Sequence, residues 1–203
     1  MRNGVQTREV RESILDATDK LLSTVGYKKM TIDDLARVVG IGKGSVYLHF
    51  TSKEEIALSH VDRIVERLKA RLIKIANEGF SCESRIRRML AERVLFRFDS
   101  VQHYTRSFDE MLSAIRPSLM LRRARYFEEE AEIFARVIGE GIEKGEFEEG
   151  SVPEHAECLL LATNSLLPLS LTTKELGERA EIEEKVLCLA RLLLDGLIVR
   201  TNG

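Results

Sequence analysis

Apolar side chains recur at every third or fourth position along almost the whole chain, and this spacing restricts the fold more than any other feature. Clear apolar stripes run through residues 14–22, 57–75 and 120–138. Such stripes are typical of amphipathic α-helices, whereas the side chains of a half-buried strand alternate with a period of two. The chain has only three prolines and no tryptophan, which also favours long helices. The sequence therefore predicts an all-α fold.

Helical spacing continues through the second half of the chain. Further helices are expected over residues 83–98, 101–115, 153–170 and 180–199. Proline is well tolerated in the first turn of a helix. We therefore expect Pro117 to open a new long helix directly after the one at 101–115.

Two helix starts near the N-terminus carry strong capping signals. Thr31 precedes a short apolar stripe and has Asp34 three residues later, as in a capping box, and Gly40 is placed to end this helix. Ser52 and Glu55 repeat the same pattern before the next apolar stripe. The residues between these helices, 40–50, read GIGKGSVYLHF.

The three glycines of this segment raise the question of a phosphate-binding loop. A nucleotide-binding loop of the G-x-x-x-x-G-K-[ST] or G-x-G-x-x-G type follows a buried strand. Here the glycines have other spacings and a capped helix precedes them, so both phosphate-loop readings fail. A short capped helix, a tight turn with glycine and a second short helix are instead the parts of a helix-turn-helix.

A helix-turn-helix reading assigns a side to each residue of the segment. Ile41 and Val46 are expected to point into the core. The residues expected to project outward are Lys43, Ser45, Tyr47 and His49, and Gly44 would let the backbone approach a phosphate. Lysine neutralises phosphates, and hydroxyl groups donate hydrogen bonds to phosphate oxygens. These residue types therefore suit double-stranded DNA, with binding that weakens as salt rises.

The distribution of charge agrees with a nucleic-acid partner at one end of the chain. Residues 1–53 hold nine lysines and arginines against six acidic residues, whereas the remainder holds 22 basic and 27 acidic residues. A basic head on an acidic body suits contact with a polyanion through that head.

The first residues and the cysteines of the sequence indicate the compartment. The first residues, MRNGVQTREVRESI, show no apolar core of a signal peptide. Cys82, Cys158 and Cys188 are widely spaced and odd in number, which favours reduced, buried thiols over a disulfide framework. The expectation is a cytoplasmic protein without a membrane-spanning segment.

Residues 14–61 resemble the N-terminal domain of TetR-family transcriptional regulators. The resemblance rests on the first helix ending in "LLSTVGY", on "TIDDLA", on "GIGKGSVY" with its aromatic close, and on "SKEE", all in the expected order. It implies an all-α homodimer of about nine helices. Residues 1–52 would form the helix-turn-helix DNA-binding domain, and residues 53–203 the larger ligand-binding and dimerisation domain.

The resemblance also implies roles for individual residues. Lys43, Ser45, Tyr47 and His49 fall on positions of the recognition helix that contact DNA. Positions that contact phosphate correspond to Thr31 and Lys53, and Gly44 remains the point of close backbone approach. Gly42 departs from a common serine, so one hydroxyl contact is expected to be missing. Packing or capping roles remain open for Tyr47, His49, Thr31 and Lys53.

An effector site is expected among the helices that follow the DNA-binding domain. The candidate residues are Phe96, His103, Tyr104, Arg106, Tyr126, Phe127 and Asn164. Ordinary helix packing is the alternative for each of them. If Arg106 or His103 points inward, an anionic ligand is favoured, and if both point outward, a neutral apolar one. The expected effector is an unidentified, largely apolar small molecule.

The last two predicted helices have apolar faces wider than one core-facing stripe requires. The resemblance implies dimerisation through these helices, and the predicted interface residues are Leu159, Thr163, Leu166, Val186, Ala190, Leu193 and Leu197. Burial deep in the core of a monomer is the alternative.

The predicted function is a ligand-responsive repressor that binds a palindromic operator as a dimer. An activator or a co-repressor-dependent regulator of the same fold is the alternative, and a structural nucleoid binder is a third possibility. No HExxH or GxSxG motif is present, so no catalytic residues, cofactor or metal are expected.

Overall fold

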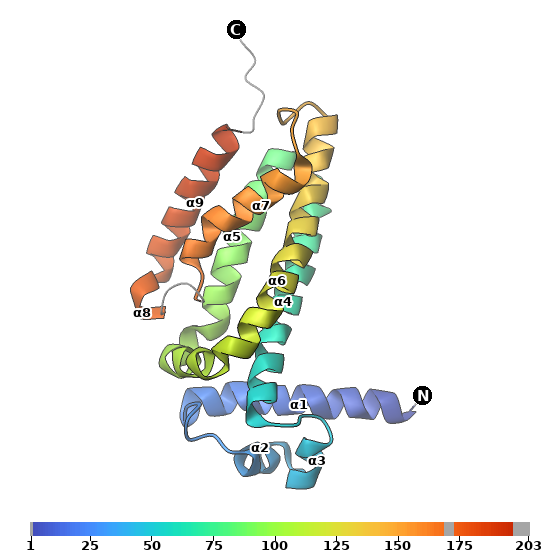
Figure 1. Cartoon of the computed structure of the whole chain (residues 1–203), viewed down its shortest axis with the longest axis vertical. Coiled ribbons are helices and arrows are strands. Elements are labelled where there is room, and N and C mark those ends of the chain that lie inside the picture. Colours follow the sequence, from blue (N-terminus) through green and yellow to red (C-terminus); the bar gives the residue numbers. More distant parts are fainter. Residues whose placement is uncertain (1, 169–172, 197–203) are drawn as a thin grey trace. The chain divides into compact units, whose positions relative to one another are not determined.

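The computed structural model describes residues 2–168 and 173–196 (Figure 1). The described part of the chain is helical and contains no β-strand, which confirms the all-α prediction. The α-helices are α1 (Arg2–Thr24), α2 (Ile32–Val39), α3 (Lys43–Tyr47), α4 (Lys53–Ala76), α5 (Cys82–Val101), α6 (Thr105–Glu143), α7 (Val152–Thr163), α8 (Thr173–Leu176) and α9 (Arg179–Asp195). Short 3-10 turns cover Gln102–Tyr104 and Asn164–Leu166. Within these described ranges seven helices have eight residues or more, fewer than the nine or so expected, because α3 and α8 have only five and four.

The prediction that Pro117 opens a new helix is wrong. Pro117 lies inside α6, which runs without a break for 39 residues. A proline in a helix interior removes one backbone hydrogen bond and its ring crowds the preceding turn, at a cost of about 3 kcal/mol. Ile115 and Leu119 on either side of it are almost fully buried, and this packing offsets the cost and keeps both parts helical.

The helix predicted over 153–170 also ends early. The α-helical part stops at Thr163, and Leu167 has an extended backbone with φ −99° and ψ 147°. Pro168 explains this end, because a proline disfavours helical angles at the residue before it.

The described chain forms two compact units. Of the described residues, the first contains 2–64 and 101–121, and the second contains 65–100, 122–168 and 173–196. Both α4 and α6 contribute residues to each unit. The expected division into domains at residues 1–52 and 53–203 stays a prediction.

The first unit is built on α1, which packs against α2, while α2 packs against α3 (Figure 1). Its fully buried side chains come from all of these helices and from the turns between them. They include Ile14, Leu15, Leu22, Met30, Leu35, Val46 and Phe50. Burial of a leucine or isoleucine side chain contributes about 1.5–3 kcal/mol, so these side chains stabilise the packing of the short α2 and α3 on the longer α1.

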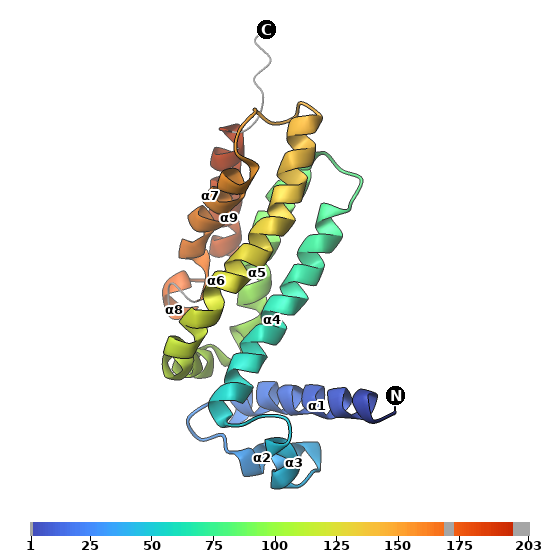
Figure 2. The same cartoon turned by 45° about the vertical axis from the view of Figure 1, so that its right-hand side comes forward.

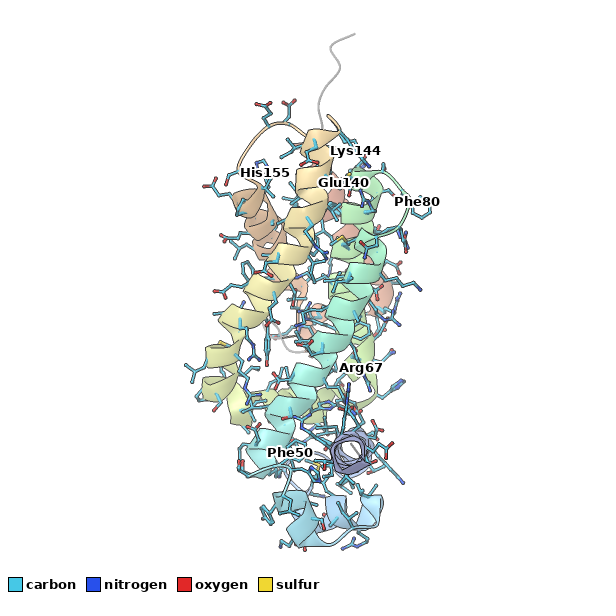
Figure 3. All side chains as sticks on the ribbon, turned by 90° about the vertical axis from the view of Figure 1, so that its right-hand side faces the viewer. Phe50, Arg67, Phe80, Glu140, Lys144 and His155 are labelled. Carbon is cyan, nitrogen blue, oxygen red and sulfur yellow. The ribbon has the colours of Figure 1, made fainter. Side chains whose placement is uncertain are left out.

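The second unit is a helical bundle with one large apolar core. Buried residues of α4, α5, α6, α7 and α9 meet in this core, among them Leu72, Met89, Phe134, Leu160 and Leu194. Figure 2 shows the parts of α4, α5 and α6 that belong to this unit running side by side, with α7 and α9 packed on them. Near the end of α6, Glu140 and Lys144 lie one turn apart and form an ion pair of 2.6 Å (Figure 3).

The cysteine expectation holds for one residue only. Cys82 is buried, but Cys158 and Cys188 are exposed. They lie on the outer sides of α7 and α9, whose other sides supply the core, so the apolar residues beside them in the sequence do not imply their burial. Nowhere in the described ranges does a helix have the length and apolar character needed to cross a membrane. Among the same residues, no cluster of histidine, cysteine and acidic side chains is placed to hold a metal ion.

Candidate nucleic-acid interface

The start of α2 is fixed by the capping box that its sequence predicts. The Thr31 hydroxyl accepts a hydrogen bond of 3.2 Å from the Asp34 amide, and the Asp34 carboxylate accepts one of 3.1 Å from the Thr31 amide. Hydrogen bonding from the Thr31 hydroxyl is the main cause that lowers the pKa of the Asp34 carboxyl, and Arg37 lowers it further. Thr31 is therefore a cap in this structure. Its side chain is exposed, but its hydroxyl donates to Asp34 at 2.7 Å, so a contact with phosphate would require that hydrogen bond to be exchanged.

Gly40 ends α2 and makes the turn toward α3. Its φ of 78° lies in the left-handed region, and its amide donates a hydrogen bond of 2.9 Å to the carbonyl of Ala36. A residue with a side chain would be strained at this angle. The turn is therefore fixed by the backbone, and it sets where α3 begins.

Helix α3 is anchored by two buried apolar residues. Val46 is 0% exposed and Phe50, just after the helix, is 2% exposed. Phe50 lies close to the start of α4, and the Arg11 guanidinium lies 4.9 Å from the centre of its ring (Figure 3). Ile41, also expected to point inward, is half-buried. Because α3 has only five residues, these anchors decide which of its sides faces solvent.

The outer side of α3 carries most of the predicted DNA contacts. Lys43, Gly44 and Tyr47 are exposed, whereas Ser45 and His49 are half-buried. At Gly44 a side chain would meet nothing within 4 Å. The chain's own packing therefore does not require a glycine there, and the bare backbone is free to approach a partner closely.

Lys43 is held by an acidic neighbour. Its ammonium group donates a hydrogen bond of 2.7 Å to Asp33, and both side chains are about half exposed. This hydrogen bond is the main cause that raises the pKa of Lys43. A lysine in such an exposed pair remains charged and gives up its partner at little cost, so Lys43 can exchange Asp33 for a phosphate oxygen.

Lys53 lies at the first residue of α4, which Ser52 caps by accepting a hydrogen bond of 3.1 Å from the Glu55 amide. The Lys53 ammonium group lies 4.3 Å from the centre of the Tyr27 ring. Partial burial lowers the pKa of Lys53, and burial also raises the pKa of the Tyr27 hydroxyl to about 12. Lys53 is thus placed by a cation–π contact and is not a freely solvated charge.

Two exposed residues of this region were missed by the sequence reasoning. Leu48, directly after α3, is 85% exposed, and the side chain of Arg37 is 77% exposed at the end of α2. A leucine next to a short helix suggests core, and only the burial of Val46, two residues earlier and therefore on the opposite side, places Leu48 on the outer side. Arg37 carried the simpler signal of a basic residue in the last turn before the glycine.

The predicted effector residues do not come together in one compact unit. His103, Tyr104 and Arg106 belong to the first unit, whereas Phe96, Tyr126, Phe127 and Asn164 belong to the second. His103 is exposed, and the Arg106 side chain is 94% exposed. Both therefore point outward, the condition under which a neutral apolar ligand is favoured.

Tyr104 is part of a buried polar network within the first unit. Its hydroxyl donates a hydrogen bond of 3.0 Å to Asp19 of α1 and lies 3.0 Å from the Nε2 atom of His60 on α4. Asp19 also accepts a hydrogen bond of 2.5 Å from Arg63. These contacts connect α1 to α4 and give Tyr104 a structural role.

The remaining effector candidates lie in or near the core of the second unit. Phe96 and Phe127 are half-buried against that core. Tyr126 is buried, with the Arg125 guanidinium 5.5 Å from the centre of its ring. Asn164 accepts a hydrogen bond of 2.8 Å from Arg93.

Arg93 is the centre of a buried charge network that the sequence reasoning missed. Its guanidinium bonds Glu130 at 2.8 Å and the Thr163 hydroxyl at 2.7 Å, and Arg97 also donates to Glu130. The side chains of Arg93 and Glu130 are 2% and 1% exposed. The sequence does carry a signal for this burial, because Arg93 lies on the same helical stripe as the apolar Ile86 and Leu90.

Most predicted dimer residues pack inside the chain itself. Leu159, Thr163, Val186 and Ala190 are buried without any partner chain, Leu166 and Leu193 are half-buried, and Leu197 lies outside the described residues. The opposite sides of α7 and α9 instead expose other leucines, namely Leu161, Leu187 and Leu192. A helix that is apolar on two sides does not reveal from sequence which side faces its own core.

Comparisons with known proteins agree on the nature of the N-terminal segment. Residues 14–59 match the family model described as "Bacterial regulatory proteins, tetR family". Over 94 residues, 46% of this chain, it is 33% identical to the nucleoid occlusion factor SlmA of Vibrio atlanticus. Over 105 residues, 52% of this chain, it is 27% identical to the biofilm operon icaADBC negative transcriptional regulator IcaR of Staphylococcus epidermidis.

These alignments cover only about half of each relative, 48% of SlmA and 55% of IcaR. Similarity of fold extends further. The structure of a transcriptional regulator from Cytophaga hutchinsonii aligns with a TM-score of 0.77 and 23% identity, covering 93% of this chain and 98% of the other. At that identity the likeness concerns the fold alone.

Proposed function

Because the chain belongs to the TetR family of transcriptional regulators, we propose that it is a repressor that binds a palindromic operator as a homodimer and is released by a small-molecule inducer. The observation that carries this proposal is the outer side of α3. There an exposed lysine, a bare glycine and an exposed tyrosine lie over a helix anchored by Val46 and Phe50.

The proposed contacts follow from the chemistry of these side chains. Lys43 leaves Asp33 for a phosphate or a guanine edge, and the hydroxyls of Ser45 and Tyr47 donate to phosphate oxygens or bases. Thr31 and Lys53, at the starts of α2 and α4, contact phosphates of the DNA backbone on either side of the groove that α3 enters. His49, half-buried, adds a contact from the edge of this surface.

Dimerisation is proposed through the outer sides of α7 and α9, where Leu161, Leu187 and Leu192 are exposed. A two-fold dimer presents two α3 helices to half-sites about 34 Å apart, one turn of DNA, or a small multiple of that distance. Leu192→Glu should yield monomers by analytical ultracentrifugation, because it places a charge in the proposed interface. Leu121→Glu is the matched control, because Leu121 is an exposed leucine on α6, outside the proposed interface. A Leu192→Glu protein that remains dimeric would contradict an interface on this side of α9.

The inducer is proposed to act by population shift. It binds the second unit and prefers a conformation whose two α3 helices no longer match the half-sites, and α4 and α6 carry residues of both units. The affinity for operator then falls by the inducer's differential affinity for the two conformations. Native mass spectrometry of protein from its own host would reveal a retained ligand. If that ligand at saturation left operator affinity unchanged, the proposed release would be wrong.

The test of the function itself uses a reporter gene driven by a promoter that carries the operator, which is first identified by selection from random duplexes with the protein. Reporter output is compared in cells with and without the gene for this protein. Repression predicts a higher reporter signal when the gene is deleted. A lower signal would identify an activator or a co-repressor-dependent regulator of the same fold.

One comparison favours a second candidate function. SlmA, at 33% identity over 94 residues, is named a nucleoid occlusion factor. For a protein that acts on the nucleoid and not on a promoter, gene deletion should leave transcription beside the bound sites unchanged. Genome-wide occupancy combined with transcript levels separates this outcome from repression.

A further inference from the structure

Leu48 is the most exposed large apolar residue on the surface proposed to meet DNA. It is 85% exposed, against 48% for the adjacent Tyr47. Leu48 contributes nothing to the core, since Val46 and Phe50 anchor this segment. An exposed leucine on the surface that also carries Lys43 and Tyr47 has no packing role in the isolated chain.

The backbone fixes where this leucine lies. Leu48 has helical angles, φ −70° and ψ −21°, and its amide donates a hydrogen bond of 3.2 Å to the carbonyl of Gly44. Residues four apart share one side of a helix, and a helical leucine leans toward the residue four positions before it. That residue is Gly44, where nothing lies within 4 Å of the position a side chain would take. Gly44 and Leu48 therefore share one side of this segment, and no side chain of the described residues, that of Leu48 included, fills the space beside Gly44.

The chemistry of DNA then limits what Leu48 can contact. Leucine forms no hydrogen bonds, so it gains nothing from phosphate oxygens or from the polar edges of bases. The major groove displays one apolar group that distinguishes base pairs, the C5 methyl group of thymine. Burial of that methyl against leucine is favourable.

We infer that Leu48 is a specificity-determining residue that selects a thymine in each operator half-site by contact with its C5 methyl group. This inference rests on the proposed DNA-binding function. It assigns to Leu48 a base preference that the contacts of Lys43, Ser45 and Tyr47 do not supply.

The test removes single methyl groups from the DNA. The operator is first selected from a random duplex library by the full-length protein. Each thymine is then replaced by deoxyuridine, which lacks only the C5 methyl group, and dissociation constants are measured by fluorescence anisotropy. We expect one thymine per half-site at which the replacement weakens binding about fourfold, the effect of burying one methyl group.

Two leucine variants locate the contact. Leu48→Ala should bind the thymine and deoxyuridine duplexes equally. Leu121→Ala is the matched control, because Leu121 is 84% exposed but lies on α6, and it should keep the wild-type preference. Circular dichroism checks that both variants fold, as expected for residues so exposed.

Each other outcome contradicts a different claim. If selection enriches a sequence but Leu48→Ala retains the thymine preference, or no thymine methyl matters, the inference about Leu48 is wrong while the proposed function stands. Equal weakening of both duplexes by Leu48→Ala would place Leu48 against the sugar–phosphate backbone and would also refute it. If selection enriches no sequence, the proposed function fails, and this inference fails with it.

Discussion

Replacement of Glu130 by glutamine should destabilise the protein by about 3–5 kcal/mol, the usual cost of removing one partner from a buried ion pair. Glu130 is 1% exposed and accepts hydrogen bonds from both Arg93 and Arg97, whose side chains are 2% and 11% exposed. Glutamine keeps the shape of the side chain but removes its charge. Two guanidinium groups would then share a buried site without the carboxylate between them.

The size of the effect follows from what burial already does to Arg93. Burial lowers the pKa of Arg93 to about 10 even though Glu130 partly opposes the shift. The charged guanidinium is therefore costly at this position, and loss of Glu130 removes its main compensation. Hydrogen bonds to Thr163, Asn164 and the Leu160 carbonyl remain, which is why the expected loss is not larger.

The assay is urea unfolding at pH 7, followed by circular dichroism at one fixed protein concentration, because a dimer's stability depends on concentration. Glu183→Gln is the control, since Glu183 pairs with Arg179 at 2.8 Å with both side chains 45% exposed. Such surface pairs contribute about 0–1 kcal/mol. If Glu130→Gln lost no more stability than Glu183→Gln, the claim that the Glu130 carboxylate stabilises the fold by compensating two buried guanidinium charges would be wrong.

Three further predictions concern acid and DNA. Burial would raise the pKa of the Glu130 carboxyl, but Arg97 and Arg93 outweigh it and hold the pKa below its ordinary value of 4.5. The stability due to the Glu130 carboxylate is therefore fully present above pH 4.5 and is lost as the pH falls through its lower pKa in the folded state. The urea midpoints of the wild type and of Glu130→Gln should accordingly converge toward pH 2. A difference between the two midpoints that stays constant with pH would contradict this dependence on the Glu130 carboxyl. Lys43→Met should lessen the salt dependence of operator binding by about two units of slope, one for each α3 of the proposed dimer, measured by anisotropy between low and high salt. An unchanged slope would exclude a phosphate contact. Tyr47→Ala should weaken specific binding by more than about tenfold while the dimer persists, because a hydrogen bond to a charged group contributes about 1.5–3 kcal/mol and the proposed dimer has two of them. Wild-type affinity in a gel-shift titration would contradict a DNA contact by Tyr47.

Local signals were enough to predict the helix-turn-helix region from sequence. The capping box of Thr31 and Asp34, the left-handed turn at Gly40 and the burial of Val46 all depend on residues within a few positions of one another. Each has a physical cause that acts at short range. The structure contains all three as expected.

Features that depend on distant packing were not predictable in the same way. Pro117 signals a helix start locally, but buried neighbours on both sides keep α6 continuous. From the sequence, Arg93 is expected to be a solvated charge. In the structure it is buried and bonded to Glu130 of α6 and Thr163 of α7, which lie far from it in the sequence. Leu159 and Ala190 lie on helices that are apolar on more than one side, and only the assembled bundle shows that they face the chain's own core.

The most direct test of the central claim is a competition binding experiment with the full-length protein. A labelled duplex carrying the selected palindrome is bound at physiological salt and then challenged with unlabelled palindrome or unlabelled bulk DNA. If the protein is a sequence-specific repressor, the unlabelled palindrome should compete at least about a thousandfold better than bulk DNA. Equal competition by the two would contradict sequence-specific operator recognition by α3.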